Sequence, residues 1–243
     1  MRPTLVAPLG LAVGVIAGLG ACGTVVPMQT ASVVAPGVTR VSGQLGAAYC
    51  DFGSTFRCND FPDGVPLPAL RLDGRRGVAS ATDVGASAQL ETMLYAPERP
   101  VGLGLTLDGK RELLRSGGGG RVAHVLSAGL LVGGGIAGRW GLAPWLRADA
   151  GVPIFYGIQT AHYEFVLSGW TAYRALAPSV GGDQDLPTVH SLRFGGGLGV
   201  YRRAPVGWGA SLGYDTSSDL VLGGAVQVRF GWFRDLGAPS PGS

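Results

Sequence analysis

The sequence predicts an all-β protein, an antiparallel up-and-down transmembrane β-barrel of about ten strands, within a range of about eight to twelve. Three observations support this fold class: apolar residues recur at every second position, the alternating segments are long, and the residues between the apolar ones are small or polar. In "LVLGGAVQVRFGWF" (220–233), for example, Val226, Val228 and Phe230 share one phase, and Gln227 and Arg229 share the other. A period of two is typical of a strand with two different faces.

Four other segments show the same alternation. They are "VGLGLTLDG" (101–109), "LRADAGVPI" (146–154), "SLRFGGGLGVY" (191–201) and "VGWGASLGY" (206–214). In each of them one phase holds mostly Leu, Val, Ile or aromatic residues, and the other holds mostly Gly, Ser, Arg or Asp. A strand of this kind turns an oily face to one side and a small or polar face to the other.

The predicted strands cover most of the chain after its first 37 residues. Strands in soluble proteins average about five or six residues, whereas strands that cross a membrane need about nine to eleven. The segments found here are mostly of the longer kind, which favours a membrane barrel. Their ranges are 38–50, 66–79, 82–95, 100–110, 121–134, 142–156, 162–175, 188–202, 206–215 and 220–233.

A soluble β-sandwich or lipocalin-like barrel would also alternate, and it is the competing fold. Its polar face would meet water and would be rich in Lys, Glu and Thr. Here that face is mostly Gly, Ala and Ser with a few charges, which suits a narrow interior better than a solvated surface. Aromatic residues, which normally form girdles at the membrane interfaces, make up only 8% of the chain.

The N-terminus has the layout of a secretory signal. Arg2 provides a positive start, and residues 5–20 carry no charge. The stretch "LGAC" that follows, Leu19 to Cys22, resembles the lipobox of bacterial outer-membrane lipoproteins. That resemblance implies cleavage before Cys22, a lipid on its sulfur and handling by the lipoprotein-processing machinery, with the outer membrane as destination because Gly23 follows rather than Asp.

The other two cysteines, Cys50 and Cys58, flank "DFGSTFR". An even pair in an exported chain predicts a disulfide. A metal site is the alternative, but two ligands are too few and no histidine is near.

The expected organisation is a signal peptide at 1–21, a lipidated tether at 22–37, a barrel at 38–233 and a flexible tail at 234–243. An even strand count puts both chain ends on the periplasmic side. Most connections alternate between long and short accordingly, but "KRELLRSGGGG" is a long connection on the short-turn side, so the strand number could differ by two. The ending "VQVRFGWF" resembles the terminal strand of outer-membrane barrels, implying contact with the barrel-assembly machinery.

Charged residues in the non-oily phase are expected to point into the barrel. A small barrel is filled by side chains, so these charges are expected to form either a salt-bridged interior or a narrow conduit. The residues are Arg71, Asp73, Arg75, Glu91, Asp108, Arg147, Asp149, Arg193 and Arg229.

Catalysis is not expected. His190 and Ser191, with Asp183 or Asp185, suggest a hydrolase, but adjacent strand residues point to opposite faces and cannot form a nucleophile–base pair. The net charge of +3 is too small and too scattered for nucleic-acid binding, and no cofactor or metal is predicted. The expected function is that of a non-enzymatic outer-membrane barrel with a structural or interaction role or narrow small-solute passage, in contact with outer-membrane lipids. The alternative is a lipid-tethered periplasmic barrel or sandwich that binds an apolar ligand.

Overall fold

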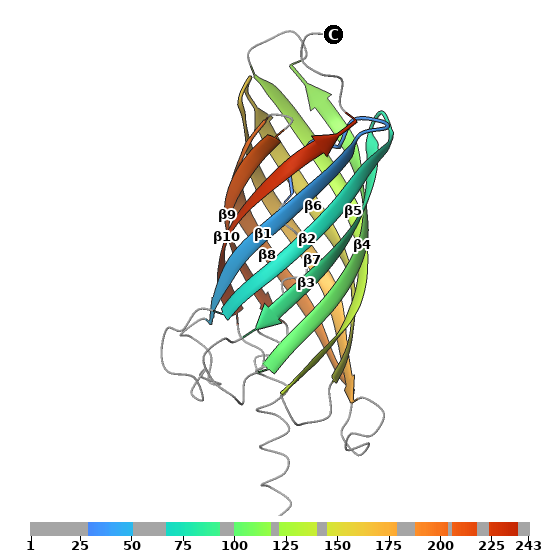
Figure 1. Ribbon diagram of the computed structural model, residues 1–243, viewed down its shortest axis with the longest axis vertical. Coiled ribbons are helices and arrows are strands. Elements are labelled where there is room, and N and C mark those ends of the chain that lie inside the picture. Colours follow the sequence, from blue (N-terminus) through green and yellow to red (C-terminus); the bar gives the residue numbers. More distant parts are fainter. Residues whose placement is uncertain are drawn as a thin grey trace, which may run out of the picture.

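The computed structural model describes residues 29–50, 67–92, 100–117, 122–139, 145–178, 188–203, 206–217 and 224–237. These residues form ten long strands (Figure 1). The strands are β1 (Thr39–Cys50), β2 (Leu67–Ala79), β3 (Thr82–Thr92), β4 (Pro100–Ser116), β5 (Ala123–Arg139), β6 (Trp145–Gln159), β7 (Tyr163–Pro178), β8 (Val189–Arg202), β9 (Val206–Ser217) and β10 (Gly224–Leu236).

Every strand pairs antiparallel with its sequence neighbour, and β1 pairs with β10 to close the sheet. The closing register runs from Thr39 opposite Leu236 to Cys50 opposite Ala225. Closure leaves no sheet edge with unpaired backbone groups. A sheet that spans a lipid bilayer has to be closed in this way, because the lipid offers no hydrogen-bond partners. The predicted up-and-down barrel of about ten strands is confirmed.

The connection "KRELLRSGGGG" was expected to be long, and this expectation was wrong. Strand β4 continues to Ser116 and pairs with β5 as far as His124, with a bulge between Glu112 and Leu114. Most of the presumed loop is therefore strand. Only residues 117–122 connect β4 and β5, so this end of the barrel carries short connections throughout.

The two ends of the barrel differ. Residues 80–81, 117–122, 160–162 and 203–205 connect strands at one end, where β1 also starts and β10 finishes; we call this the turn end, and it is uppermost in Figure 1. Longer connections, such as 51–66, lie at the opposite end, which we call the loop end. Strand β10 continues three residues beyond Phe233, to Leu236, so the tail after the barrel is shorter than expected.

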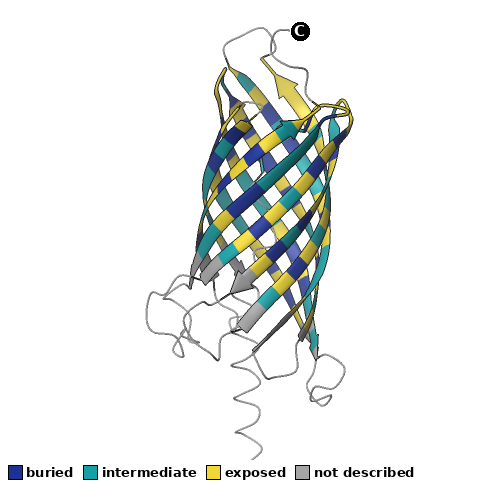
Figure 2. Ribbon diagram, viewed as in Figure 1, coloured by how far each residue is buried: buried dark blue, intermediate teal, exposed yellow. Residues whose placement is uncertain are grey.

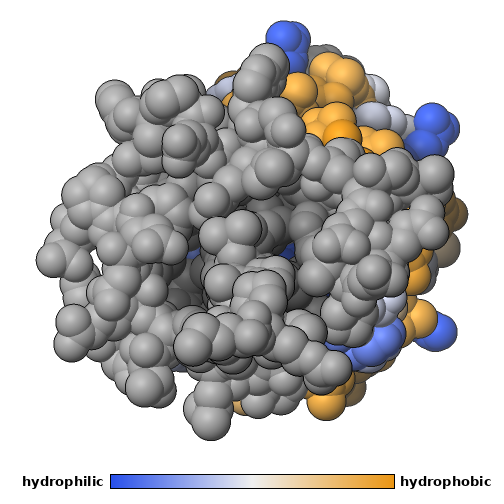
Figure 3. Space-filling model, turned by 90° about the horizontal axis from the view of Figure 1, so that it is seen from below, coloured by the Kyte–Doolittle hydropathy of each residue, from blue (hydrophilic) through white to orange (hydrophobic). Residues whose placement is uncertain are grey.

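Burial alternates along each strand, and Figure 2 shows the resulting checkerboard over the whole wall. In β7, Glu164 and Val166 are buried, whereas Phe165 and Leu167 between them are 50% and 55% exposed. Large apolar side chains thus cover the outside, part of which is visible in Figure 3. Apolar exposure on this scale is far beyond that of a soluble monomer and fits a surface in contact with lipid.

Aromatic side chains on the outer surface gather towards the two ends. Near the turn end, the ring centroid of Trp208 lies 6.4 Å from the ring centroids of both Tyr163 and Phe230. Near the loop end, Tyr173 stacks on His190 at 5.8 Å. Aromatic rings at two levels are typical of the two interfaces of a membrane barrel. Trp170 and Tyr201, by contrast, line the interior.

Candidate functional site in the barrel lumen

The lumen contains a segment of the chain itself. Residues 29–38, which we call the lumenal segment, precede β1 and lie inside the barrel at the turn end, with Ala31 fully buried. Gly37 N–H donates to the Gly77 carbonyl oxygen at 3.0 Å, and Gly77 N–H donates to the Val38 carbonyl oxygen at 3.1 Å. The second half of the expected tether is therefore part of the barrel interior.

Glu164 on β7 is the main anchor of this segment. Ser32 donates to it twice, from its backbone N–H to Oε1 at 3.0 Å and from its hydroxyl to Oε2 at 2.5 Å. The Glu164 side chain is almost completely buried. A buried carboxylate that accepts hydrogen bonds in this way satisfies both itself and the irregular backbone beside it.

Three other strands hold the segment through its backbone. Lys110 Nζ on β4 donates to the carbonyl oxygens of Thr30 at 2.7 Å and Ser32 at 2.9 Å. Ser127 on β5 donates to the Ala31 carbonyl oxygen at 2.7 Å. On β3, Asp83 accepts from the Val34 N–H at 2.8 Å. Side chains of the barrel wall thus form hydrogen bonds with the backbone groups that would pair with a neighbouring strand if this segment were part of the sheet.

Glycine on the wall makes room for the segment. A Cβ added to Gly157 would lie 2.7 Å from the Ala31 Cβ and 2.8 Å from Glu164 Oε1. Neither distance is compatible with normal packing. The absence of a side chain at Gly157 therefore leaves the space that Ala31 of the lumenal segment occupies.

The charges nearest to the segment form one cluster. Arg75 on β2 contacts both Asp83 and Asp108, and Lys110 Nζ lies 3.8 Å from Asp83. Arg75 reaches Asp108 across β3 because Gly85 stands between them; a Cβ there would come within 2.8 Å of Asp108. Glycine at this position therefore permits an ion pair between strands that are not adjacent.

A second cluster lies on β1, β2 and β3. Arg71 Nε lies 2.7 Å from Asp73, and Gln44 donates to the same carboxylate at 2.7 Å. The remaining Arg71 nitrogens donate to Gln89 at 3.0 Å and to Ser87. Arg71 is thereby fully engaged inside the wall.

A third cluster lies on β6 and β7. Asp149 accepts from Arg174 Nε at 2.6 Å and lies 3.1 Å from Arg147 Nε. Arg174 is buried, as is Arg193 on the neighbouring β8, and the Arg147 side chain is only 9% exposed. On β10, Arg229 donates to Gln227. Ion pairs and hydrogen bonds accordingly replace water along much of this wall.

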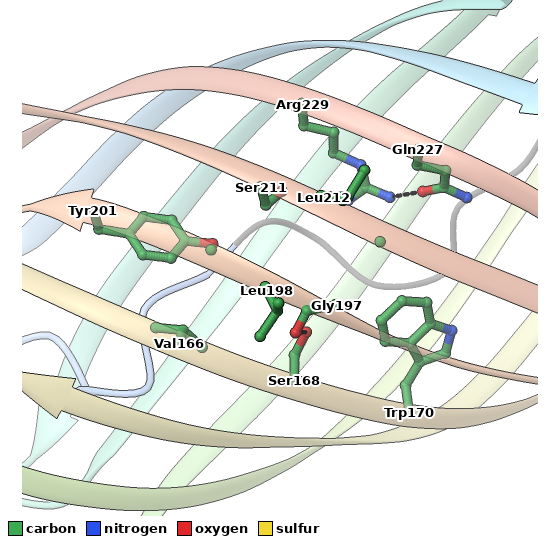
Figure 4. A pocket seen from close by; sticks show the side chains of 12 residues that line it. Val166, Ser168, Trp170, Gly197, Leu198, Tyr201, Ser211, Leu212, Gln227 and Arg229 are labelled. Carbon is green, nitrogen blue, oxygen red and sulfur yellow. Dashed lines mark hydrogen bonds between the residues drawn. The ribbon is translucent and has the colours of Figure 1, made fainter.

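A small hollow remains between these groups. It lies inside the wall of β7 to β10 and has about 390 Å³ of open space, including space open to solvent, with Trp170 towards one end and Tyr201 towards the other (Figure 4). Small residues such as Ser168, Gly197 and Ser211 line it. The hollow has the size for a few waters.

The structure places eight of the nine predicted interior charges in the lumen-facing phase. Six of them belong to the three clusters, and a seventh, Arg193, lies on the strand next to the third cluster. Arg229 is the eighth and pairs with Gln227. Glu91 lies on β3 opposite Ala69, and its side chain is outside the described residues.

Sequence reasoning missed more buried polar residues than it found. Seven of them share the phase of a predicted residue on the same strand; Lys110, for example, follows Asp108 by two positions. The other four lie on β1, β5 and β7, for which no interior charge was predicted. Extending the alternation to the whole of each strand would have found them. They are Gln44, Asp83, Ser87, Gln89, Lys110, Ser127, Gln159, Glu164, Arg174, Ser191 and Gln227.

The candidate hydrolase residues are not brought together. His190 is exposed on the outer surface, where its Nδ1 contacts the Tyr173 hydroxyl, while Ser191 is buried in the wall facing the lumen. Asp183 and Asp185 lie outside the described residues.

Of the three cysteines, Cys22 and Cys58 lie outside the described residues, and only the backbone of Cys50, the last residue of β1, is described. The described part of the chain contains no group of three or more His, Cys, Asp or Glu arranged to hold a metal ion. It also contains no helix long and apolar enough to cross a membrane.

No protein-family model matches the sequence, and no curated protein matches it. Solved structures that resemble the fold include the outer membrane protease OmpT from Escherichia coli, with 8% identity, a TM-score of 0.36 and coverage of 82% of this chain and 96% of that one. LpxR from Salmonella typhimurium has 10% identity, a TM-score of 0.38 and coverage of 79% and 99%. The KdgM porin has 8% identity, a TM-score of 0.29 and coverage of 79% and 98%.

Proposed function

We propose that this chain is a non-enzymatic outer-membrane β-barrel lipoprotein whose lumen is closed by its own lumenal segment, and whose role is structural or interaction-based. The observation that carries the proposal is the way residues 29–38 fill the turn end of the barrel, with Ser32 held by the buried Glu164. A segment anchored by charge-assisted hydrogen bonds, each worth about 1.5–3 kcal/mol, closes the lumen stably.

The distribution of histidines supports a role without catalysis. All three histidines, His124, His162 and His190, are exposed and none lies in the lumen. The inward serines that are described, such as Ser127 and Ser191, therefore have no imidazole beside them to act as a general base. The inner charges pair with one another, which is what a structural interior requires.

The closed lumen is tested by electrical recording from the protein reconstituted in planar lipid bilayers. We expect no stepwise ion current from the unmodified protein, because the lumenal segment and the ion pairs leave only small hollows. A steady, ohmic current would contradict the proposal and would favour the second candidate function, narrow small-solute passage. That candidate is favoured by one observation, the hollow between Trp170 and Tyr201.

Lipidation at Cys22 is tested separately. We expect Cys22→Ala to lose incorporation of labelled palmitate, because the thioether has no sulfur to form on. We also expect the variant to stay in the membrane fraction and to keep a heat-modifiable migration on gels, because the apolar outer wall holds it in lipid without the anchor. Release of this variant into the soluble fraction would favour the tethered soluble barrel instead.

A further inference from the structure

The outer wall of the barrel has a groove on its lipid-facing surface. It crosses β2 to β5 and holds about 1190 Å³ of open space, including the space outside its rim. Val84, Leu107, Leu130 and Val132 form its sides, and all four are exposed.

Small residues form the floor of the groove. Gly74 on β2, Ala86 on β3 and Gly109 on β4 share the outward phase and lie next to one another, since Gly74 pairs with Ala86 and Gly109 pairs with Val84. A Cβ added to Gly74 would meet nothing within 4 Å, and one added to Gly109 would meet only the Asp83 carbonyl oxygen, at 4.0 Å. The protein itself leaves this space empty, so a flexible chain from outside fits into it.

Arginine marks one end of the groove. Arg76 lines the groove at its turn end, and Arg111 lies beyond it on β4. The two are separated only by β3, because Arg76 pairs with Val84 and Arg111 pairs with Thr82. Both side chains are exposed on the outside. The carboxylates at this level, Asp83 and Asp108, face the lumen and do not neutralise them there.

From this arrangement we propose a binding site for one anionic phospholipid, with an acyl chain in the groove and the phosphate between Arg76 and Arg111. The shape accommodates a flexible apolar chain, and the guanidinium groups match a phosphate at the interface. Two other exposed arginines at the turn end, Arg202 and Arg234, do not line this groove. The site rests on the proposed embedding of the barrel in a membrane, and goes beyond it in naming one lipid class and one position.

The site is tested by native mass spectrometry of the full mature protein, released from detergent after incubation with phosphatidylglycerol or, in parallel, phosphatidylcholine. We expect the unmodified protein to retain one phosphatidylglycerol more tightly than phosphatidylcholine. In the double variant Arg76→Gln, Arg111→Gln, retention of phosphatidylglycerol is expected to weaken roughly thirty-fold, since each arginine near an anionic lipid is worth about 1 kcal/mol. Arg202→Gln is the matched control and is expected to retain the lipid.

The acyl-chain half of the site needs its own variants. Gly74→Leu and Gly109→Leu fill the groove with side chains that the fold has room for, and both are expected to lose the retained lipid although the arginines remain. Gly169→Leu adds the same bulk to the outer face of β7, where the nearest atom to a Cβ is 3.9 Å away, and it should behave like the unmodified protein.

Heat-modifiable migration on gels is measured for every variant and shows whether its barrel is folded. A folded variant that loses the lipid tests the binding site, whereas a variant that does not fold tests the membrane barrel itself. Two outcomes would overturn the site. The first is equal retention of phosphatidylglycerol and phosphatidylcholine by the unmodified protein. The second is that the folded groove variants and the folded arginine variant retain phosphatidylglycerol as well as the unmodified protein does.

Discussion

Replacing Glu164 by alanine is expected to release the lumenal segment and to give the barrel an ion current that the unmodified protein lacks. The substitution removes both acceptors of Ser32, whose two hydrogen bonds are 2.5 and 3.0 Å long. Each such bond to a charged group contributes about 1.5–3 kcal/mol, so the segment loses its main anchor. The current is measured in the same planar bilayers as for the unmodified protein, as the frequency and size of opening steps.

Two further variants make this result specific. Glu164→Gln keeps an acceptor of the same length without its charge, and we expect fewer openings from it than from Glu164→Ala. Gly157→Leu keeps the Glu164 carboxylate in the chain but puts a side chain against both the Ala31 Cβ and Glu164 Oε1, so it is expected to displace the segment and to conduct as well. If folded Glu164→Ala and Gly157→Leu barrels both stayed silent, the lumenal segment would not be what closes the lumen.

Replacing Asp149 by alanine is expected to cause the largest loss of stability, about 3–5 kcal/mol, because a buried ion pair is broken from one side. Asp149 accepts from Arg174 at 2.6 Å and lies 3.1 Å from Arg147, and the variant leaves both buried guanidinium groups without it. The measurement is the free energy of unfolding in urea, followed in lipid vesicles by tryptophan fluorescence.

The matched control for this prediction is Asp235→Ala. That variant also breaks an aspartate–arginine pair, with Arg40 at 2.6 Å, but one that is partly exposed at the turn end. It is expected to cost about 1 kcal/mol or less, as exposed pairs do. A loss for Asp149→Ala no larger than that of the control would show that the third cluster does not stabilise the interior. No ion current is expected from folded Asp149→Ala, because its carboxylate does not contact the lumenal segment.

Most of the barrel could be predicted because its wall obeys a local rule. A strand in such a wall places alternate residues in lipid and in the lumen, so the composition of the two phases shows the inside and the outside before any pairing is known. The segment "VGLGLTLDG" already separates Leu105 and Leu107, which lie outside, from Asp108, which lies inside. The rule was weakest where strands extend beyond the apolar band. There "KRELLR" carries charges in both phases, a pattern that predicts a loop, although the segment is the end of β4.

The lumenal segment followed no such rule. Residues 29–38 have neither the alternation nor the length of a strand, and their sequence "QTASVVAPGV" is compatible with a tether. The groups that hold them, Asp83, Lys110, Ser127 and Glu164, come from four different strands. Nothing in the spacing of these residues indicates that they converge.

The fold class, the strand phases and the inward direction of the charged side chains could thus be predicted from residue order alone, because each follows from the two-residue period of a strand between lipid and a narrow interior. The pairing of the charges, the reach of Arg75 over Gly85 to Asp108, and the filling of the lumen by the chain before β1 became visible only in the folded barrel. Those contacts depend on the register between strands and on the closing of β1 against β10. Residues far apart in the sequence, such as Ser32 and Glu164 at 132 positions, thereby come to hydrogen-bonding distance. A local pattern carries no information about distances of that kind.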